Sequence, residues 1–218
     1  MAHQALFCRW PMVVIVRGVP WWGVISSAVA PVLLIGGWTA AARLQPRPFN
    51  SVTETISALA AQDAADRWLM TFALLGAGAC YVTTALALRA AAGPGRLVLI
   101  VGGAATVLVA ANPEPAGNGS VAHTIWAATA FIAMSIWPAL SRGRGFRVAF
   151  GLQPAVCAIA TAVLLGLLIW FYAELAAGGR QLGLAERVLA GAQVLWPLAV
   201  VLSCRWNQSH AQESLAVS

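Results

Sequence analysis

The sequence predicts an all-α fold: a polytopic membrane helical bundle of six transmembrane helices with both termini in the cytoplasm. The chain of 218 residues is 60% hydrophobic and only 9% charged, whereas a soluble domain carries roughly a quarter charged residues. Apolar runs of about 15–25 residues recur along it, and each is long enough to cross a hydrocarbon core of ~30 Å as a helix. Runs such as LVLIVGGAATVLVAA do not alternate in polarity, as the strands of a membrane barrel would.

The apolar runs divide the chain into six predicted spans with short or polar connections. The spans lie at about residues 22–42, 68–88, 96–111, 122–140, 148–172 and 184–204. The first run continues without a clear small-residue cleavage site, so we interpret it as a retained span and not as a signal peptide. The domain prediction is an N-terminal cytoplasmic or interfacial segment (1–20), a transmembrane domain (21–205) and a C-terminal cytoplasmic tail (206–218).

The distribution of arginine predicts the orientation of these spans. The net charge is +6 and the chain contains no Lys. If the basic connections 89–96 and 141–147 lie on one side with both termini, six of the seven acidic residues lie on the other side. Basic loops stay in the cytoplasm, so we expect both termini inside. The Arg-only, Ala-rich composition suggests a bacterial genome, and hence a bacterial plasma membrane.

Several kinds of chemistry are not indicated. The arginines flank the spans instead of forming one patch, which argues against nucleic-acid binding. The four cysteines lie in or beside apolar segments without CxxC spacing, so no zinc site is indicated. Three histidines, of which one lies near a span, are too few for paired haem ligation or a multi-His metal centre. We therefore predict no metal and no cofactor, and the sequence also lacks HExxH, GxSxG and P-loop motifs.

The first outer connection contains the stretch NSVTETISALAAQDAADRW. Ser51-Val-Thr-Glu54 matches a capping box, in which a hydroxyl and a carboxylate bind free amides at a helix start. The apolar residues that follow recur at spacings of three and four, which predicts a short interfacial helix in this loop. Asp63 is expected to cap the second span, and Asp66 to lie in its first turn.

Candidate functional residues gather on the same outer side. His123 lies near the start of the fourth span, where a helix N-terminus favours the neutral imidazole. A neutral His123 beside Glu54 or Glu114 could act as a general base, or it could be an interfacial hydrogen-bonding residue. Glu54 and His123 are the catalytic candidates if the protein is an enzyme. The binding candidates are Ser57, Asn112, Glu114, Glu174, Glu186 and Arg187.

Three functions stay open at this point. The first is an outward-facing polar pocket that binds a lipid or small amphiphile, or docks a partner protein. The second is an intramembrane enzyme that uses carboxylate and His acid–base catalysis on a lipid or isoprenoid, since a low dielectric raises a carboxylate pKa toward neutrality. The third is a small transporter, although no broken-helix pair is evident near the midplane. Membrane lipids are the expected partners.

Three short motifs resemble a known family when taken in order within a six-span frame. ETISALAA in the first outer loop, NPEPAGNGSVAH before the fourth span and GLAERV before the sixth resemble the bacterial family called domain of unknown function 998. The resemblance covers roughly residues 50–205 and implies a six-span fold without a defined activity. It carries family elements onto Ser57-Ala58-Leu59-Ala60, onto Pro113, Glu114 and His123, and onto Gly183, Leu184 and Arg187. Ala58 stands where an acid is common, which argues against a charge-based role there.

Overall fold

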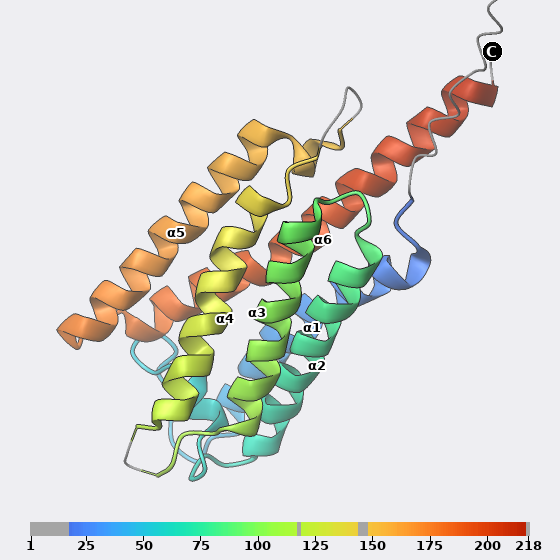
Figure 1. Cartoon of the computed structure of the whole chain (residues 1–218). Helices are drawn as coiled ribbons and strands as arrows, with labels where there is room; N and C mark the ends of the chain where they lie inside the picture. The colour runs from blue at the N-terminus through green and yellow to red at the C-terminus, as the bar shows by residue number, and fades with distance from the viewer. Residues whose placement is uncertain (1–17, 117–118, 144–147, 217–218) are drawn as a thin grey trace, which may run out of the picture.

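The protein is a helical bundle in the computed structural model, which describes residues 18–116, 119–143 and 148–216. Within these residues every regular element is helical, and six helices are long and apolar enough to cross a membrane. They are α1 (Trp21–Arg43), α2 (Arg67–Ala87), α3 (Gly93–Ala111), α4 (Val121–Leu140), α5 (Pro154–Ala177) and α6 (Leu182–Ala216). Two short 3-10 helices are η1 (Ser57–Ala60) and η2 (Phe150–Leu152). The predicted all-α, six-span fold is confirmed (Figure 1).

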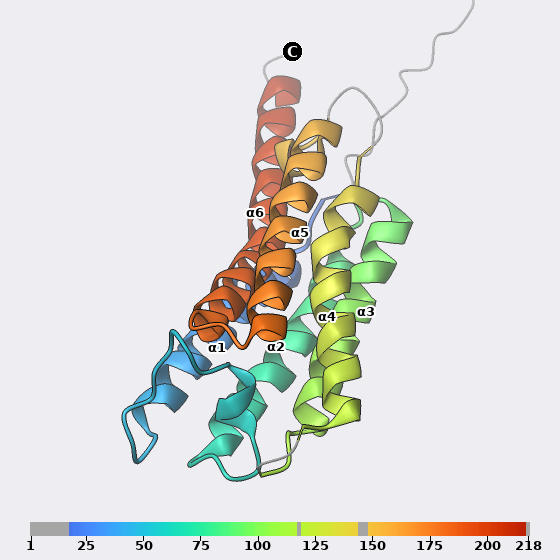
Figure 2. The ribbon, with the colours of Figure 1, turned by 90° about the vertical axis from the view of Figure 1, so that its left-hand side faces the viewer.

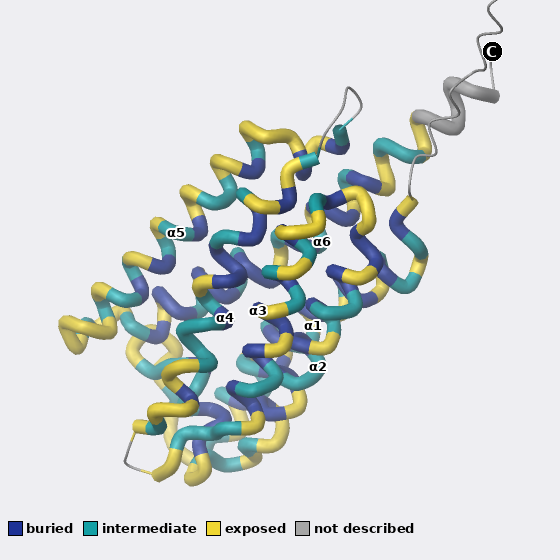
Figure 3. The backbone as a smooth tube through the Cα atoms, viewed as in Figure 1, coloured by how far each residue is buried: buried dark blue, intermediate teal, exposed yellow. Residues whose placement is uncertain are grey.

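The helices close a ring. Consecutive helices pack against each other from α1 to α6, and α6 returns to pack against α1. Figure 2 shows α5 beside α6 and α3 beside α4. Helix α5 is the least covered of the spans, with 28% of its apolar window buried against 50% for α2, and Figure 3 shows exposed residues along its length. An apolar helix with so much exposed surface suits contact with lipid tails.

Small residues set the closest contact between α2 and α3. A Cβ atom added at Gly78 would lie 2.6 Å from the carbonyl oxygen of Gly103, and one added at Gly103 would lie 2.7 Å from that of Gly78. The two backbones therefore touch directly, as small-residue interfaces allow in membranes, where packing drives helix association. Gly78 belongs to the stretch LLGAGACY in the second span.

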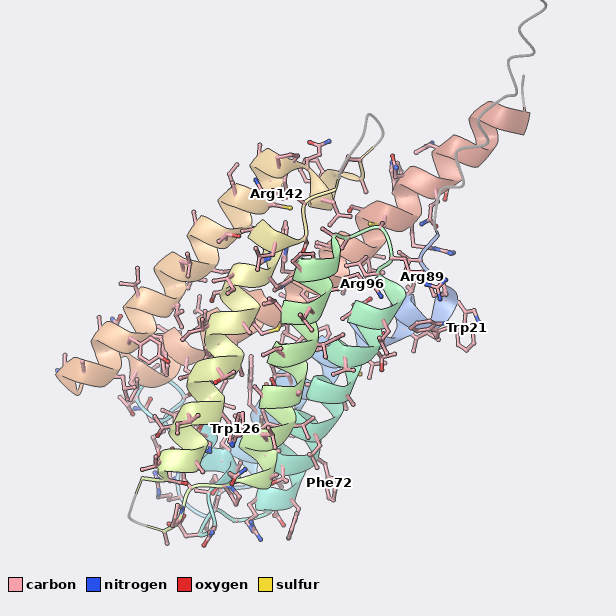
Figure 4. All side chains as sticks on the ribbon, viewed as in Figure 1. Trp21, Phe72, Arg89, Arg96, Trp126 and Arg142 are labelled. Atoms are coloured by element: carbon pink, nitrogen blue, oxygen red, sulfur yellow. The ribbon has the colours of Figure 1, made fainter. Side chains whose placement is uncertain are left out.

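The connections separate into two groups at opposite ends of the bundle. Figure 4 shows Arg89, Arg96 and Arg142 toward one end, and Phe72 and Trp126 toward the other. The second end carries the connections 44–66, 112–120 and 178–181, and we call it the outer end, following the predicted orientation. The grouping of loops agrees with the charge pattern of the sequence, while the assignment of sides stays a prediction.

Two element boundaries differ from the predicted spans. Helix α5 begins at Pro154 and not near 148, because residues 150–152 form η2 and a proline is favoured at the first helical position. It ends at Ala177, and the C-cap residue Gly178 takes the left-handed conformation (φ 58°) common after helices. Helix α6 continues to Ala216, through residues predicted as a tail, since no Gly or Pro follows Pro197. Most of the predicted N-terminal segment lies outside the described residues.

Candidate functional site

The first outer connection, residues 44–66, lies across the outer end of the bundle and is held by two other segments. The N–H of Leu184, at the start of α6, donates to the carbonyl of Val52 at 3.0 Å. The N–H of Gln62 donates to the carbonyl of Glu114, in the connection between α3 and α4, at 2.9 Å. The loop therefore covers the helix ends instead of extending into solvent.

Arg187 fastens this loop to α6. Its Nη1 donates to the carbonyls of Ser51 at 2.9 Å, Glu54 at 2.7 Å and Gly183 at 2.9 Å. Gly183 makes the close approach possible, because a Cβ atom there would lie 2.2 Å from the carbonyl oxygen of Glu54. Arg187, predicted as a ligand-binding residue, thus donates these hydrogen bonds to the protein's own backbone. Its Nη2 is buried and has no hydrogen-bond partner within the described residues.

The predicted capping box, with Ser51 as its N-cap, does not form. The carbonyls of Ser51 and Glu54 accept hydrogen bonds from Arg187. A turn forms instead, in which Oδ1 of Asn50, and not the hydroxyl of Ser51, accepts the N–H of Val52 at 3.0 Å. The helical part of the loop is limited to the single 3-10 element η1.

The capping prediction for α2 also differs from the structure. Asp66 occupies the N-cap position in a left-handed conformation (φ 49°) and makes no side-chain capping hydrogen bond. The helix begins with Arg67, one residue earlier than predicted. Arg67 lies over the ring of Trp68, with its guanidinium carbon 4.3 Å from the ring centroid. Asp66 thus supports the start of α2 through its backbone, whose carbonyl accepts the N–H of Leu69 at 2.9 Å.

Glu54 is engaged in an ion pair on the exposed side of the loop. Both of its oxygens accept hydrogen bonds from the guanidinium of Arg47, and Oε1 also accepts the N–H of Asn50 at 2.8 Å. The hydrogen bond from Arg47 is the main reason that the pKa of Glu54 lies below its ordinary value. No hydrogen bond joins Glu54 to His123 among the described residues, so the structure does not bring this predicted acid–base pair together.

His123 instead pairs with Ser57. The imidazole is 4% exposed, its Nδ1 lies 3.0 Å from the carbonyl oxygen of Asn112, and its Nε2 lies 3.1 Å from Oγ of Ser57. A carbonyl only accepts hydrogen bonds, so Nδ1 carries the proton and, in the neutral ring, Nε2 accepts the Ser57 hydroxyl. Oε1 of Glu114 lies 3.5 Å from the same Nε2. The backbone N–H of His123 donates to Oγ of Ser120, and Ser120 thereby caps the start of α4.

Glu186 is the buried carboxylate of the outer end. It is 4% exposed, and its Oε2 accepts the N–H of Ile56 at 2.5 Å. The side chain comes from the first turns of α6, whereas Ile56 directly precedes Ser57 in the first loop. Ionisable groups at this depth are expensive and often functional. We name Ser57, His123, Glu114 and Glu186 the outer polar cluster.

A narrow cavity runs inward from this cluster. Its volume is about 70 Å³, and its wall comes from α1, α2, α3, α4 and α6 together with Ile56 and Ser57 of the loop. Ser57 and Glu186 line its outer end, and Tyr81 and Gln193 line it deeper in the bundle. The rest of the wall is largely apolar. The cavity therefore joins an apolar interior to polar groups near the outer surface.

Gln193 shows how the deeper part of the cavity is built. Its Nε2 donates to the carbonyl of Phe131 and to Oγ of Ser135, both at 2.9 Å, which links α6 to α4. Sequence reasoning missed Gln193 and Tyr81, although Gln193 is the only strongly polar side chain between Arg187 and Ser203. The side-chain amide of Gln193 within an apolar span could have predicted a hydrogen bond to a neighbouring helix.

The remaining predicted residues lie apart from the cavity. Oε2 of Glu174 accepts the N–H of Gln181 at 2.9 Å and so closes the connection between α5 and α6. The side chain of Asn112 donates to the carbonyl of Leu108 at 2.8 Å, so Asn112 meets the outer polar cluster through its backbone. No group of three or more His, Cys, Asp or Glu within the described ranges is placed to hold a metal ion.

The fold and this cluster define a class of protein: a polytopic helical membrane protein with a buried polar group at one end of an internal cavity. A family model described as "Protein of unknown function (DUF998)" matches residues 28–203. The chain therefore belongs to this family, as the motif resemblance implied, and the match runs from within α1 to within α6. No curated protein and no solved structure matches the sequence.

Proposed function

We propose that the protein binds a lipid or other small amphiphile inside the bundle, with the polar end of the ligand at the outer polar cluster and its apolar part in the cavity. The observation that carries this proposal is the position of Ser57 and Glu186 at the outer end of a largely apolar cavity. A carboxylate offers about four lone-pair sites, and Ile56 occupies one with its N–H. Glu186 can therefore accept a hydrogen bond from a ligand.

The size and charge of the cavity narrow the ligand class. A volume of about 70 Å³ admits a short alkyl segment, or a few waters at about 10–15 Å³ each, and is too small for a phosphodiester headgroup. The carboxylates of Glu186 and Glu114 also disfavour an anionic group at the outer end. We expect an uncharged polar end such as a hydroxyl or ester, attached to a slender chain.

A cavity-filling variant tests the proposal. Ala130 is buried and lines the cavity, so Ala130→Leu should fill it and displace the ligand. Ala104 is an exposed alanine of α3, and Ala104→Leu adds the same atoms on the outside of the bundle. Native mass spectrometry of protein purified in mild detergent should find the bound lipid in the wild type and in Ala104→Leu, and not in Ala130→Leu. Equal lipid content in all three proteins would contradict the proposal.

An intramembrane enzyme is the second candidate, and the position of His123 favours it. The buried imidazole of His123 is hydrogen-bonded to Ser57, and Ser57 lines the cavity together with the buried Glu186. A lipid bound in the cavity would therefore lie near acid–base groups. Glu54, the predicted partner of His123, is bound to Arg47 instead. Partner docking and transport have no specific contact in their favour within the described residues.

A further inference from the structure

Ser57 has the surroundings of an activated hydroxyl. Its Oγ lies 3.1 Å from Nε2 of His123, which is within the reach of a general base. The other ring nitrogen of His123 is fixed by the carbonyl of Asn112 at 3.0 Å. This is the order of groups that activates a serine nucleophile: a hydroxyl, a base and a third group that orients the base.

Ser57 also faces the place where a ligand would lie. It lines the outer end of the cavity together with Glu186 and Ile56, so a carbonyl carbon at the polar end of a bound lipid would come next to Oγ. We propose that Ser57 is a nucleophile toward the carbonyl of a lipid ester whose first acyl carbons enter the cavity, with His123 as its general base. This inference rests on the proposed function, because those acyl carbons must occupy the cavity.

The reaction balances without a cofactor. Nε2 of His123 takes the hydroxyl proton while Oγ of Ser57 forms a bond to the ester carbonyl carbon. The bond from that carbon to the alcohol oxygen then breaks, and the imidazolium returns the proton to the departing alcohol. Water, deprotonated by the same nitrogen, releases the acyl group as a carboxylic acid and restores the serine.

Two features of the site set the expected rate. Oε1 of Glu114 lies 3.5 Å from Nε2 of His123, so its charge favours the imidazolium that forms when Ser57 loses its proton. The N–H of Ile56, however, is already bound by Glu186 and does not serve a developing oxyanion. Loss of one such donor lowers rates about 10²–10³-fold in serine hydrolases, so acylation and deacylation should both be slow.

Covalent labelling tests the nucleophile directly. A long-chain alkyl fluorophosphonate, added to the purified protein in mild detergent, should phosphonylate Ser57 with loss of fluoride, and peptide mass spectrometry should locate the label there. Ser57→Ala should abolish labelling. Ser27→Ala is the matched control, because Oγ of Ser27 donates to the Val24 carbonyl and meets no histidine, and its labelling should equal that of the wild type. His123→Gln should slow labelling by about 10²–10⁴-fold.

The outcomes separate this inference from the proposed function. A label on any residue other than Ser57 in the wild type, or no label at all, would overturn the nucleophile assignment without the need for a variant that folds. The lipid-binding proposal would still stand if native mass spectrometry found the ligand in the wild type and not in Ala130→Leu. Labelling of Ser57 that is unchanged in Ala130→Leu would show that the acyl chain lies outside the cavity, and would contradict the inference as stated.

Discussion

Two glutamates of the outer end take opposite roles because their surroundings differ. Glu54 lies on the exposed side of the first loop and is neutralised by the guanidinium of Arg47. Glu186 is buried, lines the cavity and has the backbone N–H of Ile56 as its hydrogen-bond donor. The carboxylate of Glu54 costs little free energy because solvent and Arg47 surround it. Burial of the Glu186 carboxylate costs much more, and ionisable groups kept in such positions often have a function. We therefore place the ligand contact at Glu186.

The ion pair of Glu54 predicts an acid-dependent loss of stability. The pKa of Glu54 is lowered in the folded protein, mainly by the hydrogen bond from Arg47. A lowered pKa stabilises the fold above the ordinary value of 4.5, and that contribution disappears as the pH falls through the lowered value. Thermal unfolding in detergent between about pH 6 and pH 3 should show this loss in the wild type and a smaller one in Arg47→Ala. Equal losses in both proteins would contradict the assignment.

At the residue scale, the sequence predicted which residues gather at the outer end, but it did not predict the contacts between them. His123, Glu186 and Ser57 were candidates from their residue types and their position on the acid-bearing side, and the structure brings all three to the outer end. The sequence did not predict that Ser57 would form a hydrogen bond with His123, because 66 residues separate the two. Such pairings depend on how the loops fold over the helix ends, which no local pattern records.

At the element scale, the start of α6 is the segment that positions the first loop. Gly183, Glu186 and Arg187 lie within a little over one turn, and each contacts the loop backbone: Gly183 by close approach, Glu186 and Arg187 by hydrogen bonds. The helical part of this loop is the short element η1 (Ser57–Ala60). Tertiary hydrogen bonds set the path of the rest of the loop, and local propensity is a weak prior against such contacts.

Gly183→Ala should weaken the packing of the first loop against the start of α6 and lower the stability of the protein. The added Cβ atom would lie 2.2 Å from the carbonyl oxygen of Glu54, and because that atom belongs to the backbone the loop must move. Overpacking of this kind costs about 1–3 kcal/mol. Gly166→Ala is the control, since a Cβ atom there meets nothing within 4 Å and alanine favours a helix by about 1 kcal/mol. Reversible unfolding in mixed micelles should show lower stability for Gly183→Ala alone, and equal stabilities would contradict the close approach.

At the scale of the whole molecule, the two sets of loops predict a definite topology. Reporter fusions after Ala92 and after Gly143, in the basic connections, should give cytoplasmic signals because arginine-rich loops are retained inside. A fusion after Gly117 should give an external signal. A reversed pattern at any of the three positions would contradict the assignment of the outer end, and with it the side from which a ligand enters.

The sequence was sufficient for the number and approximate limits of the spans, because hydrophobic length alone determines what crosses a bilayer. It was not sufficient for the ring of helices or the cavity. Contacts such as the one between Gly78 and Gly103 depend on which faces meet, and α1 and α5 are apolar around most of their circumference. A helix without a polar face carries no local signal for its orientation.

Photoaffinity labelling tests most directly whether an amphiphile occupies the interior of the bundle. An alkyl alcohol with a diazirine within the first few carbons of its chain would be bound to the purified protein and irradiated, and the labelled residues would be located by peptide mass spectrometry. If the amphiphile lies inside the bundle, the labels should fall on cavity-lining residues such as Met134 and Ala190, and an excess of unlabelled alcohol should remove them. Labels confined to exposed residues of α5, such as Ile159 and Val163, and insensitive to that competitor would contradict an interior position.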